Sequence, residues 1–304
     1  MQPTLTPEVL IVGGSYAGLS AAMALGRARR SVLVLDAQRP RNRFTPHAHN
    51  LLLHDGDAPA DLAARARQQV AAYPTVQLLA AEATTATQLP DGSFAVATAA
   101  HGTFTASKLL LATGLRDELL PIPGLAECWG KSVIHCPFCH GYEVADQPTG
   151  FLLNGELVGH QATMLRNWTH ELTAFTNGPA TFNDAVRQQL VAQGVGLEET
   201  PIAELLHHAG QLTGLRLADG RHLPLPVLYA SPTPPWHQAS ALPAQLGCAL
   251  TDQGLVQVDA QYQTTVPGVL AAGDCCTGMH QLAGAIAAGN MAGAMLSRQL
   301  IFSA

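Results

Sequence analysis

The side chains best suited to chemistry in this 304-residue chain are two cysteines separated by two residues. Cys136 and Cys139 enclose Pro137 and Phe138, and His140 follows directly. Such a pair can open and close as a reversible disulfide, and proline suits the first position of a helix. A thiol at a helix N-terminus ionises more readily, because the helix dipole stabilises the thiolate. The spacing therefore predicts a redox-active dithiol.

Two other kinds of site share this pattern. Cys-x-x-Cys-His is also the attachment signature of haem c. That group requires export, and the first residues of the chain lack the basic segment of a secretory signal. A zinc site would need a second Cys-x-x-Cys or a His-x-x-x-His pair at finger spacing, which the sequence lacks. We therefore expect no metal, and the surrounding sequence favours dithiol chemistry.

Length and composition narrow the class of protein. A chain of 304 residues can form two domains, and 47% of its residues are hydrophobic and 12% charged. Lys and Arg number 16 against 22 Asp and Glu, a net charge of -6, which argues against nucleic acid as a partner. No apolar run approaches the roughly 18 residues of a membrane span. Six cysteines are too few for a disulfide-stapled secreted scaffold. We expect a soluble cytoplasmic protein.

The N-terminal region has the element order of a dinucleotide site. An apolar strand over Val9–Val12 is followed by the turn Gly13–Gly18 and by an alanine-rich helix over 19–30. A second apolar strand over 31–35 then leads to Asp36. In this strand-turn-helix-strand arrangement, the N-terminus of the helix receives the pyrophosphate of a dinucleotide.

Five residues of this region are candidates for cofactor binding. Gly13 permits the tight turn, and Gly18 lets the helix approach the strand. Asp36 follows at close to the spacing expected for a carboxylate on an adenosine ribose. Ser15 replaces the middle glycine of the motif, and it is small and able to donate a hydrogen bond to phosphate. Ala17 completes the set.

Two later motifs carry a family resemblance. Leu110–Gly114 and Thr264–Asp274 resemble the FAD-binding halves of the flavoproteins with two dinucleotide-binding domains. With Cys136 and Cys139 between them, nearly the whole chain is similar to the low-molecular-weight thioredoxin reductases. The resemblance implies an α/β fold with two Rossmann-like domains, the second inserted into the first. It also implies FAD as the cofactor and a homodimer.

Strand and turn signals give the domain boundaries, and the segment lengths fit the layout of the family. They indicate a first FAD segment over 1–116, an inserted NAD(P)H-like domain with the cysteines over 117–233, and a second FAD segment over 234–304. Proline-rich stretches at 121–124 and 232–235 mark the crossings, because such clusters do not fit inside a helix or central strand.

Carried over by resemblance, Asp274 binds the ribityl-pyrophosphate region of FAD, and the last helix begins at 280–283, beside the isoalloxazine ring. The candidate FAD residues outside the first turn are Thr113, Gly114, Gly273, Asp274, Gln281, Leu282 and Ala283.

The second nucleotide site departs from the family. A strand over 150–153 and a helix over 161–168 flank a loop in which Asn154 and Glu156 replace the first and middle glycines. Glutamate adds bulk and negative charge where the backbone must approach a pyrophosphate. NADPH-using relatives place arginines after the next strand (171–175) to grip the 2′-phosphate. No arginine lies between Arg166 and Arg187. We predict that the protein does not use NADPH.

The residue after the second cysteine differs as well. His140 stands where the family has an aspartate, and a neutral imidazole can accept a thiol proton near neutral pH. The motif is similar to that of flavin dithiol oxidases of the gliotoxin and holomycin type, which pass electrons from a dithiol substrate through FAD to oxygen. By this resemblance Cys139 lies against the flavin and Cys136 attacks the substrate.

An alternative keeps the direction of a thioredoxin (disulfide) reductase, with electrons supplied by ferredoxin, another reduced carrier or weakly bound NAD(P)H. The expected partner is a thioredoxin-like protein or a small dithiol or disulfide.

Other cysteines and histidines have less definite readings. His47 and His49 belong to a segment that covers the flavin in relatives, and they either tune the site or lie in an exposed loop. Four cysteines lack redox spacing and are interpreted as small buried apolar residues: Cys128, Cys248, Cys275 and Cys276. The last two are adjacent and would strain as a disulfide.

Overall fold

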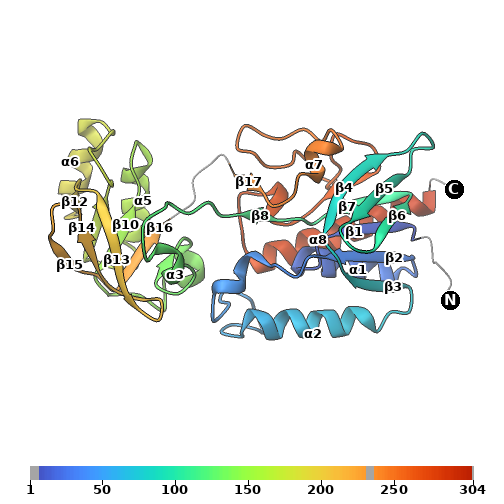
Figure 1. The fold of residues 1–304 in the computed structure, drawn as a ribbon, viewed down its shortest axis with the longest axis horizontal. Coiled ribbons are helices and arrows are strands. Elements are labelled where there is room, and N and C mark those ends of the chain that lie inside the picture. The colour runs from blue at the N-terminus through green and yellow to red at the C-terminus, as the bar shows by residue number, and fades with distance from the viewer. Residues whose placement is uncertain (1–6, 231–235, 303–304) are drawn as a thin grey trace. The chain divides into compact units, whose positions relative to one another are not determined.

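The computed structural model describes residues 7–230 and 236–302 (Figure 1). By their contacts these residues form two compact units: 7–43, 51–117 and 236–302 make unit 1, and 44–50 and 118–230 make unit 2. The proline cluster at 232–235 lies outside the described residues. The segment Phe44–Asn50 groups with unit 2, whereas the sequence places it in the first FAD segment. A Cβ on Gly130 of unit 2 would lie only 2.9 Å from the Cβ of Phe44.

Unit 1 is built on a five-stranded parallel sheet. In spatial order its strands are β18 (Val269–Ala271), β7 (Lys108–Leu111), β1 (Val9–Val12), β2 (Val32–Asp36) and β3 (Val76–Ala80). Helices α1 (Tyr16–Arg27) and α8 (Leu282–Phe302) pack on one face, and α2 (Pro59–Ala71) packs against α1.

The other face of this sheet is also covered. An antiparallel sheet and a short helix lie over it: β4 (Ala83–Gln88), β5 (Phe94–Thr98), β6 (Gly102–Ala106) and α7 (Leu242–Gln245). Successive strand residues point to opposite faces. Ile11 accordingly packs with the helices, while Leu10 packs with Phe94. A parallel strand covered on both faces is apolar throughout, which is why β1 was recognisable as a continuous apolar run.

Four short elements complete unit 1 and its border. They are the 3₁₀ turns η1 (Arg41–Phe44) and η2 (Asp274–Cys276), and the antiparallel pair β8 (Leu115–Arg116) and β17 (His237–Gln238).

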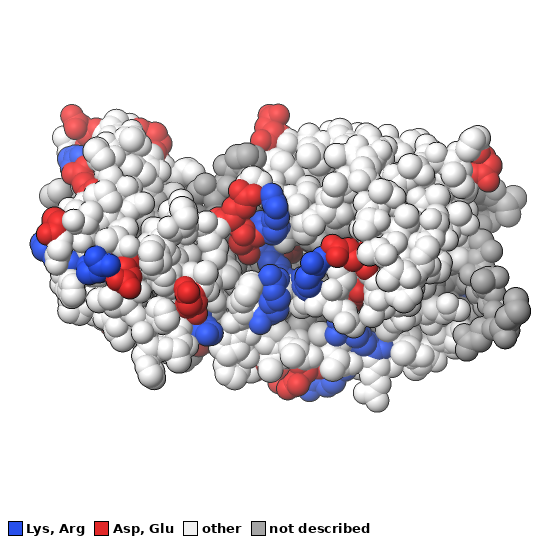
Figure 2. All heavy atoms as spheres, viewed as in Figure 1, with Lys and Arg blue, Asp and Glu red and all other residues white. Residues whose placement is uncertain are grey.

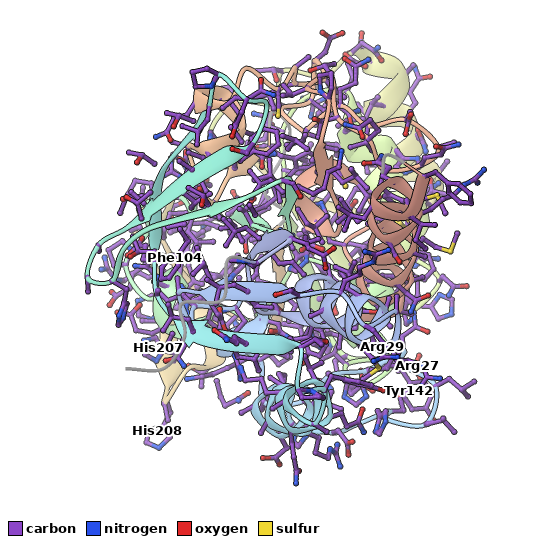
Figure 3. The ribbon with its side chains drawn as sticks, turned by 90° about the vertical axis from the view of Figure 1, so that its right-hand side faces the viewer. Arg27, Arg29, Phe104, Tyr142, His207 and His208 are labelled. Atoms are coloured by element: carbon purple, nitrogen blue, oxygen red, sulfur yellow. The ribbon has the colours of Figure 1, made fainter. Side chains whose placement is uncertain are left out.

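Unit 2 repeats the architecture. Its parallel strands are, in spatial order, β12 (Gly196–Glu198), β11 (Leu172–Phe175), β10 (Thr149–Leu152), β16 (Val227–Ala230) and β9 (Val133–Ile134). Helices α5 (Leu157–Leu165) and α6 (Asp184–Ala192) pack on one face. The other face carries α3 (Leu125–Cys128) and an antiparallel sheet of β13 (Ile202–His208), β14 (Gln211–Leu217) and β15 (His222–Pro224). The turn of β13 and β14 presents His207 and His208 at the surface (Figure 3).

These two sheets confirm the predicted α/β fold with two Rossmann-like units. Both predicted helix starts were too late. Helix α1 begins at Tyr16 instead of residue 19, because Ser15 is already the extended N-cap residue. Helix α5 begins at Leu157 instead of residue 161, because Glu156 has helical dihedral angles. Within the described residues, no helix is long and apolar enough to cross a bilayer.

Candidate active site

The dithiol turn begins where β9 ends in unit 2. Cys136 is the extended N-cap residue, and Pro137 occupies the predicted first position of α4 (Pro137–His140). The amides of Cys139 and His140 both donate to the Cys136 carbonyl oxygen at 3.2 Å. Both cysteines are half-buried. Helix α4 has only one turn, so its dipole is much weaker than the helix invoked from the sequence.

A glycine and two aromatic rings hold this turn in place. Gly141 donates to the Pro137 carbonyl oxygen at 2.7 Å. A Cβ on Gly141 would lie 2.4 Å from that oxygen and 2.8 Å from the Trp168 indole, so only glycine fits. Phe138 meets Trp168 edge to face, with ring centroids 5.4 Å apart. These contacts fix the dithiol turn against the residue stretch that follows α5.

Two histidines from the segment Phe44–Asn50 join the dithiol turn. The rings of His49 and His140 are 6.4 Å apart and nearly perpendicular, and His47 lies 6.4 Å from His49. His49 Nδ1 lies 3.4 Å from Glu143 Oε1. The neighbouring Tyr142 is 86% exposed (Figure 3). The alternative in which His49 is an exposed loop residue is therefore wrong, since its side chain is largely buried beside His140.

The surroundings of His140 favour its neutral form. Burial lowers the pKa of His140, and the charge of His49 lowers it further, while the Glu143 carboxylate opposes both. An imidazole whose pKa is below its ordinary value is largely unprotonated at pH 7. His140 can therefore accept a proton there.

The first glycine turn, in unit 1, has the geometry of a phosphate cradle. Gly13 has φ +109°, and a Cβ on it would lie 2.1 Å from the Ala112 carbonyl oxygen. A Cβ on Gly18 would lie 1.8 Å from the Gly13 carbonyl oxygen. Ser15 makes no capping hydrogen bond to α1. The turn therefore presents a helix N-terminus that side chains cannot crowd, which suits a pyrophosphate.

Asp36 lies directly against this turn. A Cβ on Gly14 would lie 2.6 Å from the Asp36 Cβ. The Asp36 carboxylate accepts a hydrogen bond from the Gln38 amide at 2.9 Å and pairs with Arg67 of α2, also at 2.9 Å. The structure thus places Asp36, the residue predicted to bind a ribose, at the turn, with the Arg67 guanidinium beside its carboxylate.

The C-terminal motif closes onto the same turn. Gly273 has φ +83°, and a Cβ on it would lie 2.8 Å from the Ala17 Cβ. Thr113 and Gly114 follow β7, adjoining Gly13 through Ala112. Leu282 and Ala283 begin α8, and Gln281 directly precedes it, with its carbonyl oxygen accepting from the Ala285 amide at 2.9 Å.

Arg41 is a member of this site that the sequence analysis missed. It binds Asp117 through Nε and Nη2, and its Nη1 lies 3.1 Å from Asp274 Oδ2. Burial tends to lower the pKa of Arg41, but the hydrogen bonds and charges of Asp117 and Asp274 outweigh it. Nothing in the local sequence of Arg41 signalled this role, because both its partners lie far along the chain.

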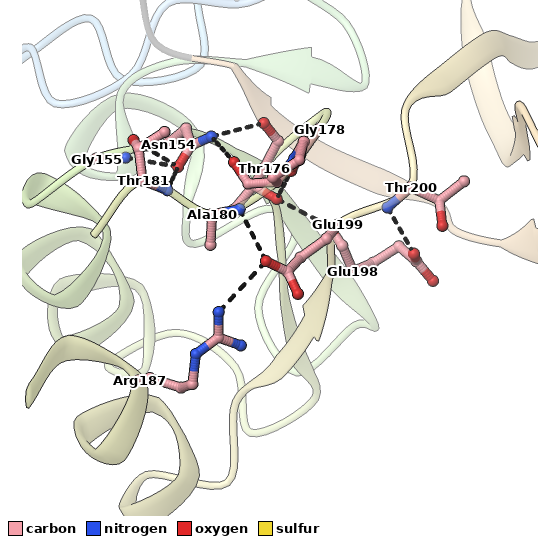
Figure 4. Close-up of polar contacts among 11 residues, drawn as sticks. Asn154, Gly155, Thr176, Gly178, Ala180, Thr181, Arg187, Glu198, Glu199 and Thr200 are labelled. Carbon is pink, nitrogen blue, oxygen red and sulfur yellow. Dashed lines mark hydrogen bonds and ion pairs between the residues drawn. The ribbon is translucent and has the colours of Figure 1, made fainter. Parts of the chain in front are cut away.

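The second nucleotide loop, in unit 2, is filled by its own side chains (Figure 4). The Asn154 amide donates to the carbonyl oxygens of Thr176 at 3.3 Å and Pro179 at 2.9 Å. Its oxygen accepts from the amides of Gly155 at 2.8 Å and Thr181 at 2.9 Å, and from the Thr181 hydroxyl. Asn154 therefore ties the end of β10 to the loop that follows β11.

Glu156 makes a second bridge of this kind. Its carboxylate accepts from the Asn183 side chain at 2.8 Å and from the Asn183 amide at 3.2 Å. Asn183 is the N-cap of α6, so its side chain also accepts from the Val186 amide at 3.1 Å. A carboxylate thus occupies the approach to α5.

The arginines near this loop are already paired with carboxylates. Arg187 lies 3.3 Å from Glu199 and stacks over the Phe182 ring. Arg221 lies 2.8 Å from Glu198, and this hydrogen bond lowers the pKa of Glu198 to about 2. Neither is placed as the open arginine cluster that grips a 2′-phosphate.

The remaining cysteines are largely buried. Cys128, Cys248 and Cys275 are at most 6% exposed, and Cys276 is half-buried. On the face shown in Figure 2, the described basic and acidic side chains are interspersed, without an extended basic surface.

Comparison with known proteins decides the family. The pyridine nucleotide-disulphide oxidoreductase model matches residues 7–289. The chain belongs to this family. Thioredoxin reductase tcpT of Claviceps purpurea is 33% identical, over 97% of this chain and 94% of that protein. Family membership confirms the resemblance seen in the sequence, and the chain is a thioredoxin-reductase-like disulfide oxidoreductase.

Solved structures with the same fold support this family assignment. An oxidoreductase from Agrobacterium tumefaciens is 39% identical with a TM-score of 0.91, covering 99% of this chain and 100% of that one. HlmI is 31% identical with a TM-score of 0.93, covering 99% of this chain and 94% of that one. Both matches span the two Rossmann-like units.

Proposed function

We propose that this family member is an FAD-dependent dithiol oxidase that passes electrons to oxygen and does not use NADPH. The observation that carries the proposal is the self-filled second nucleotide loop, in which Asn154 and Glu156 bond to their own neighbours. A pyrophosphate would have to displace these bonds and approach a carboxylate. The paired arginines, Arg187 and Arg221, leave no open cation cluster for a 2′-phosphate among the described residues of this loop.

The first turn fits FAD. The Gly13 and Gly18 amide backbone would hold the pyrophosphate with Ser15, and Asp36 would take the ribose hydroxyls. Asp274, held by Arg41, would face the ribityl-pyrophosphate region. When bound, FAD supplies an acceptor of two electrons that oxygen can reoxidise.

The cysteine pair would oxidise the substrate in two exchanges. His140 accepts a proton from one substrate thiol, and the thiolate attacks the Cys136 sulfur. The Cys136–Cys139 bond breaks, with Cys139 leaving as a thiolate. His140 passes its proton to the Cys139 thiolate and accepts the proton of the second substrate thiol. The resulting thiolate attacks the substrate sulfur of the mixed disulfide, the bond to Cys136 breaks, and the Cys136 thiolate takes that proton from His140. The substrate has lost two electrons and two protons, and the protein disulfide has become a dithiol.

The half-buried position of His140 supports its role as the base. Only the thiolate attacks, and a thiol is a few per cent ionised at pH 7. A general base typically contributes ~10²- to 10⁴-fold. Since burial and His49 lower the pKa of His140, the imidazole is ready to accept this proton at physiological pH.

Anaerobic stopped-flow absorbance tests the proposal. FAD should be released on denaturation, and dithiothreitol should bleach the flavin far faster than NADPH or NADH. Oxygen should then restore the colour and be consumed in proportion to the disulfide formed. Rapid bleaching by micromolar NADPH would refute the proposal that the second nucleotide loop does not bind NADPH.

The names of the relatives favour a second candidate. Curated relatives such as tcpT are called thioredoxin reductases. On that reading, ferredoxin, another reduced carrier or weakly bound NAD(P)H reduces the flavin, and a thioredoxin-like protein receives the electrons. Reduction of a thioredoxin by photoreduced ferredoxin plus this protein would support it. The resemblance also leads us to propose a homodimer, which light scattering measures.

A further inference from the structure

Three histidines lead from the dithiol turn to the surface. The ring centroids of His140 and His49 are 6.4 Å apart, and those of His49 and His47 are also 6.4 Å apart. His140 and His49 are half-buried, whereas His47 is exposed. A single bridging water can span such a gap between two imidazole rings. The three rings therefore connect the proposed base to solvent.

The backbone holds the two outer histidines on one side of their segment. Ala48, between them, forms a β-bridge and is buried, and neighbouring residues of an extended chain point to opposite sides. His47 and His49 accordingly point the same way, as their ring contact requires. Phe44, earlier in the segment, packs against Gly130 of unit 2. The packing of Phe44 and Ala48 thus positions both imidazoles.

Glu143 places a carboxylate at the middle of this route. Its Oε1 lies 3.4 Å from His49 Nδ1, and its side chain is 38% exposed, against 19% for His49. A negative charge at this distance stabilises positive charge on His49 while that ring holds a proton. Because Glu143 is the more exposed of the two, it also opens the route to water.

The proton balance of the cysteine pair requires a way out. When the reduced Cys136–Cys139 pair returns to its disulfide, two S–H bonds break and one S–S bond forms, which releases two electrons and two protons. Near neutral pH the two electrons pass to FAD with only one of the protons, so the second proton remains on the protein. His140, which follows Cys139 directly, is the base that receives it. His140 must lose this proton before it can accept another.

We propose that His49 relays this proton from His140 toward solvent, with Glu143 and His47 at the exit. His49 then acts through His140 and does not itself deprotonate the substrate. Its titratable neighbours are His140 and Glu143 of the dithiol turn and His47 of its own segment. The inference rests on the proposed function, since it requires the cysteine pair to exchange electrons with FAD.

The dependence of flavin reduction on buffer concentration tests the relay. His49→Gln keeps the size of the side chain but cannot carry a proton near neutral pH. In dilute buffer at pH 8, we expect saturating dithiothreitol to reduce the flavin of His49→Gln roughly tenfold more slowly than that of the wild type. Added imidazole at constant ionic strength should restore the rate of the variant and leave the wild type unchanged. At pH 8 His140 is unprotonated in both proteins, so the effect of the His49 charge on His140 does not enter.

Two further variants complete the experiment. His49→Ala leaves room for imidazole, so it should regain more of its rate from imidazole than from a bulky buffer such as HEPES. His160→Gln, on an exposed position of α5, should behave as the wild type. FAD content and the urea midpoint report whether each variant is folded. A wild-type rate in dilute buffer, or a slow rate that no buffer restores, would overturn the relay, because a structural role for His49 predicts no buffer dependence.

Failure of the relay is distinct from failure of the proposed function. If dithiothreitol does not reduce the wild-type flavin, the proposed oxidase is wrong. Photoreduced flavin then drives the same exchange in reverse, since reduction of the Cys136–Cys139 disulfide takes up the proton that its formation releases. The buffer dependence of that step in His49→Gln tests the relay in either direction of electron flow.

Discussion

His49 and Glu143 join the segment Phe44–Asn50 to the dithiol turn, with His49 Nδ1 3.4 Å from Glu143 Oε1. The pair flanks His140, and its two members act on that imidazole with opposite sign. His49 lowers the pKa of His140, and Glu143 raises it. Beyond burial, the protonation of the proposed base therefore depends on one residue that is distant in the sequence, His49, and on one that is close, Glu143.

Substitutions of His49 and Glu143 should shift the pH profile of flavin reduction in opposite directions. Flavin reduction by dithiothreitol should rise with pH as His140 loses its proton. His49→Asn removes a cause that lowers the pKa of His140, so the profile should move to higher pH. Glu143→Gln removes a cause that raises it, so the profile should move to lower pH. Stopped-flow rates between pH 5 and 8 measure both, with the exposed His160→Asn as control. Shifts of the same sign would contradict this assignment.

Loss of the base itself should have a larger effect. His140→Ala should slow flavin reduction by dithiothreitol by about 10²- to 10⁴-fold at pH 7 while FAD content stays normal. His140→Asp should also be slow, because an ionised carboxylate is a weaker base than imidazole. FAD content is measured by absorbance after denaturation. A wild-type rate in His140→Ala would move the base elsewhere, with His49 the next to be tested.

The Asn154 bridge should contribute to stability. Asn154→Ala removes the partner of the Thr181 amide and the Pro179 carbonyl oxygen, which water can then reach, so we expect a loss of about 0.5–1.5 kcal/mol in the free energy of unfolding. Urea denaturation measures this loss. Asn290→Ala, on an exposed position of α8, is the control and should change stability little. Equal stabilities would show that the bridge is not formed in solution.

The contact between α1 and α8 gives a matched pair of glycine variants. A Cβ on Gly289 would lie 2.0 Å from the Ala17 carbonyl oxygen, whereas a Cβ on Gly284 meets only the Met279 carbonyl oxygen at 3.8 Å. Gly289→Ala should destabilise by about 1–3 kcal/mol or more through overpacking. Gly284→Ala should stabilise by up to about 1 kcal/mol through helix propensity. Thermal unfolding compares them, and destabilisation by both would contradict the open space at Gly284.

The sequence by itself determined the features that depend on local backbone geometry. The position of Gly13 between an apolar strand and a helix specified the first nucleotide turn, since only glycine tolerates φ +109° beside the Ala112 carbonyl oxygen. Pro137 after Cys136 specified the dithiol turn, because proline fixes its own φ at the first helical position. Asn154 and Glu156 were recognisable as departures from the glycines of the family's motif, from which we predict weak dinucleotide binding.

The tertiary structure decided which side chains meet. The approach of His49 to His140 and Glu143, and of Arg41 to Asp274, requires segments far apart in the sequence to pack together, and no local pattern encodes that packing. The sequence shows that Asn154 stands where the motif has a glycine. It does not show that the Asn154 side chain donates a hydrogen bond to the Pro179 carbonyl oxygen and accepts one from the Thr181 amide. Hydrogen bonds and charge pairs form between groups that burial forces to find partners, and which partner is within reach depends on the folded chain.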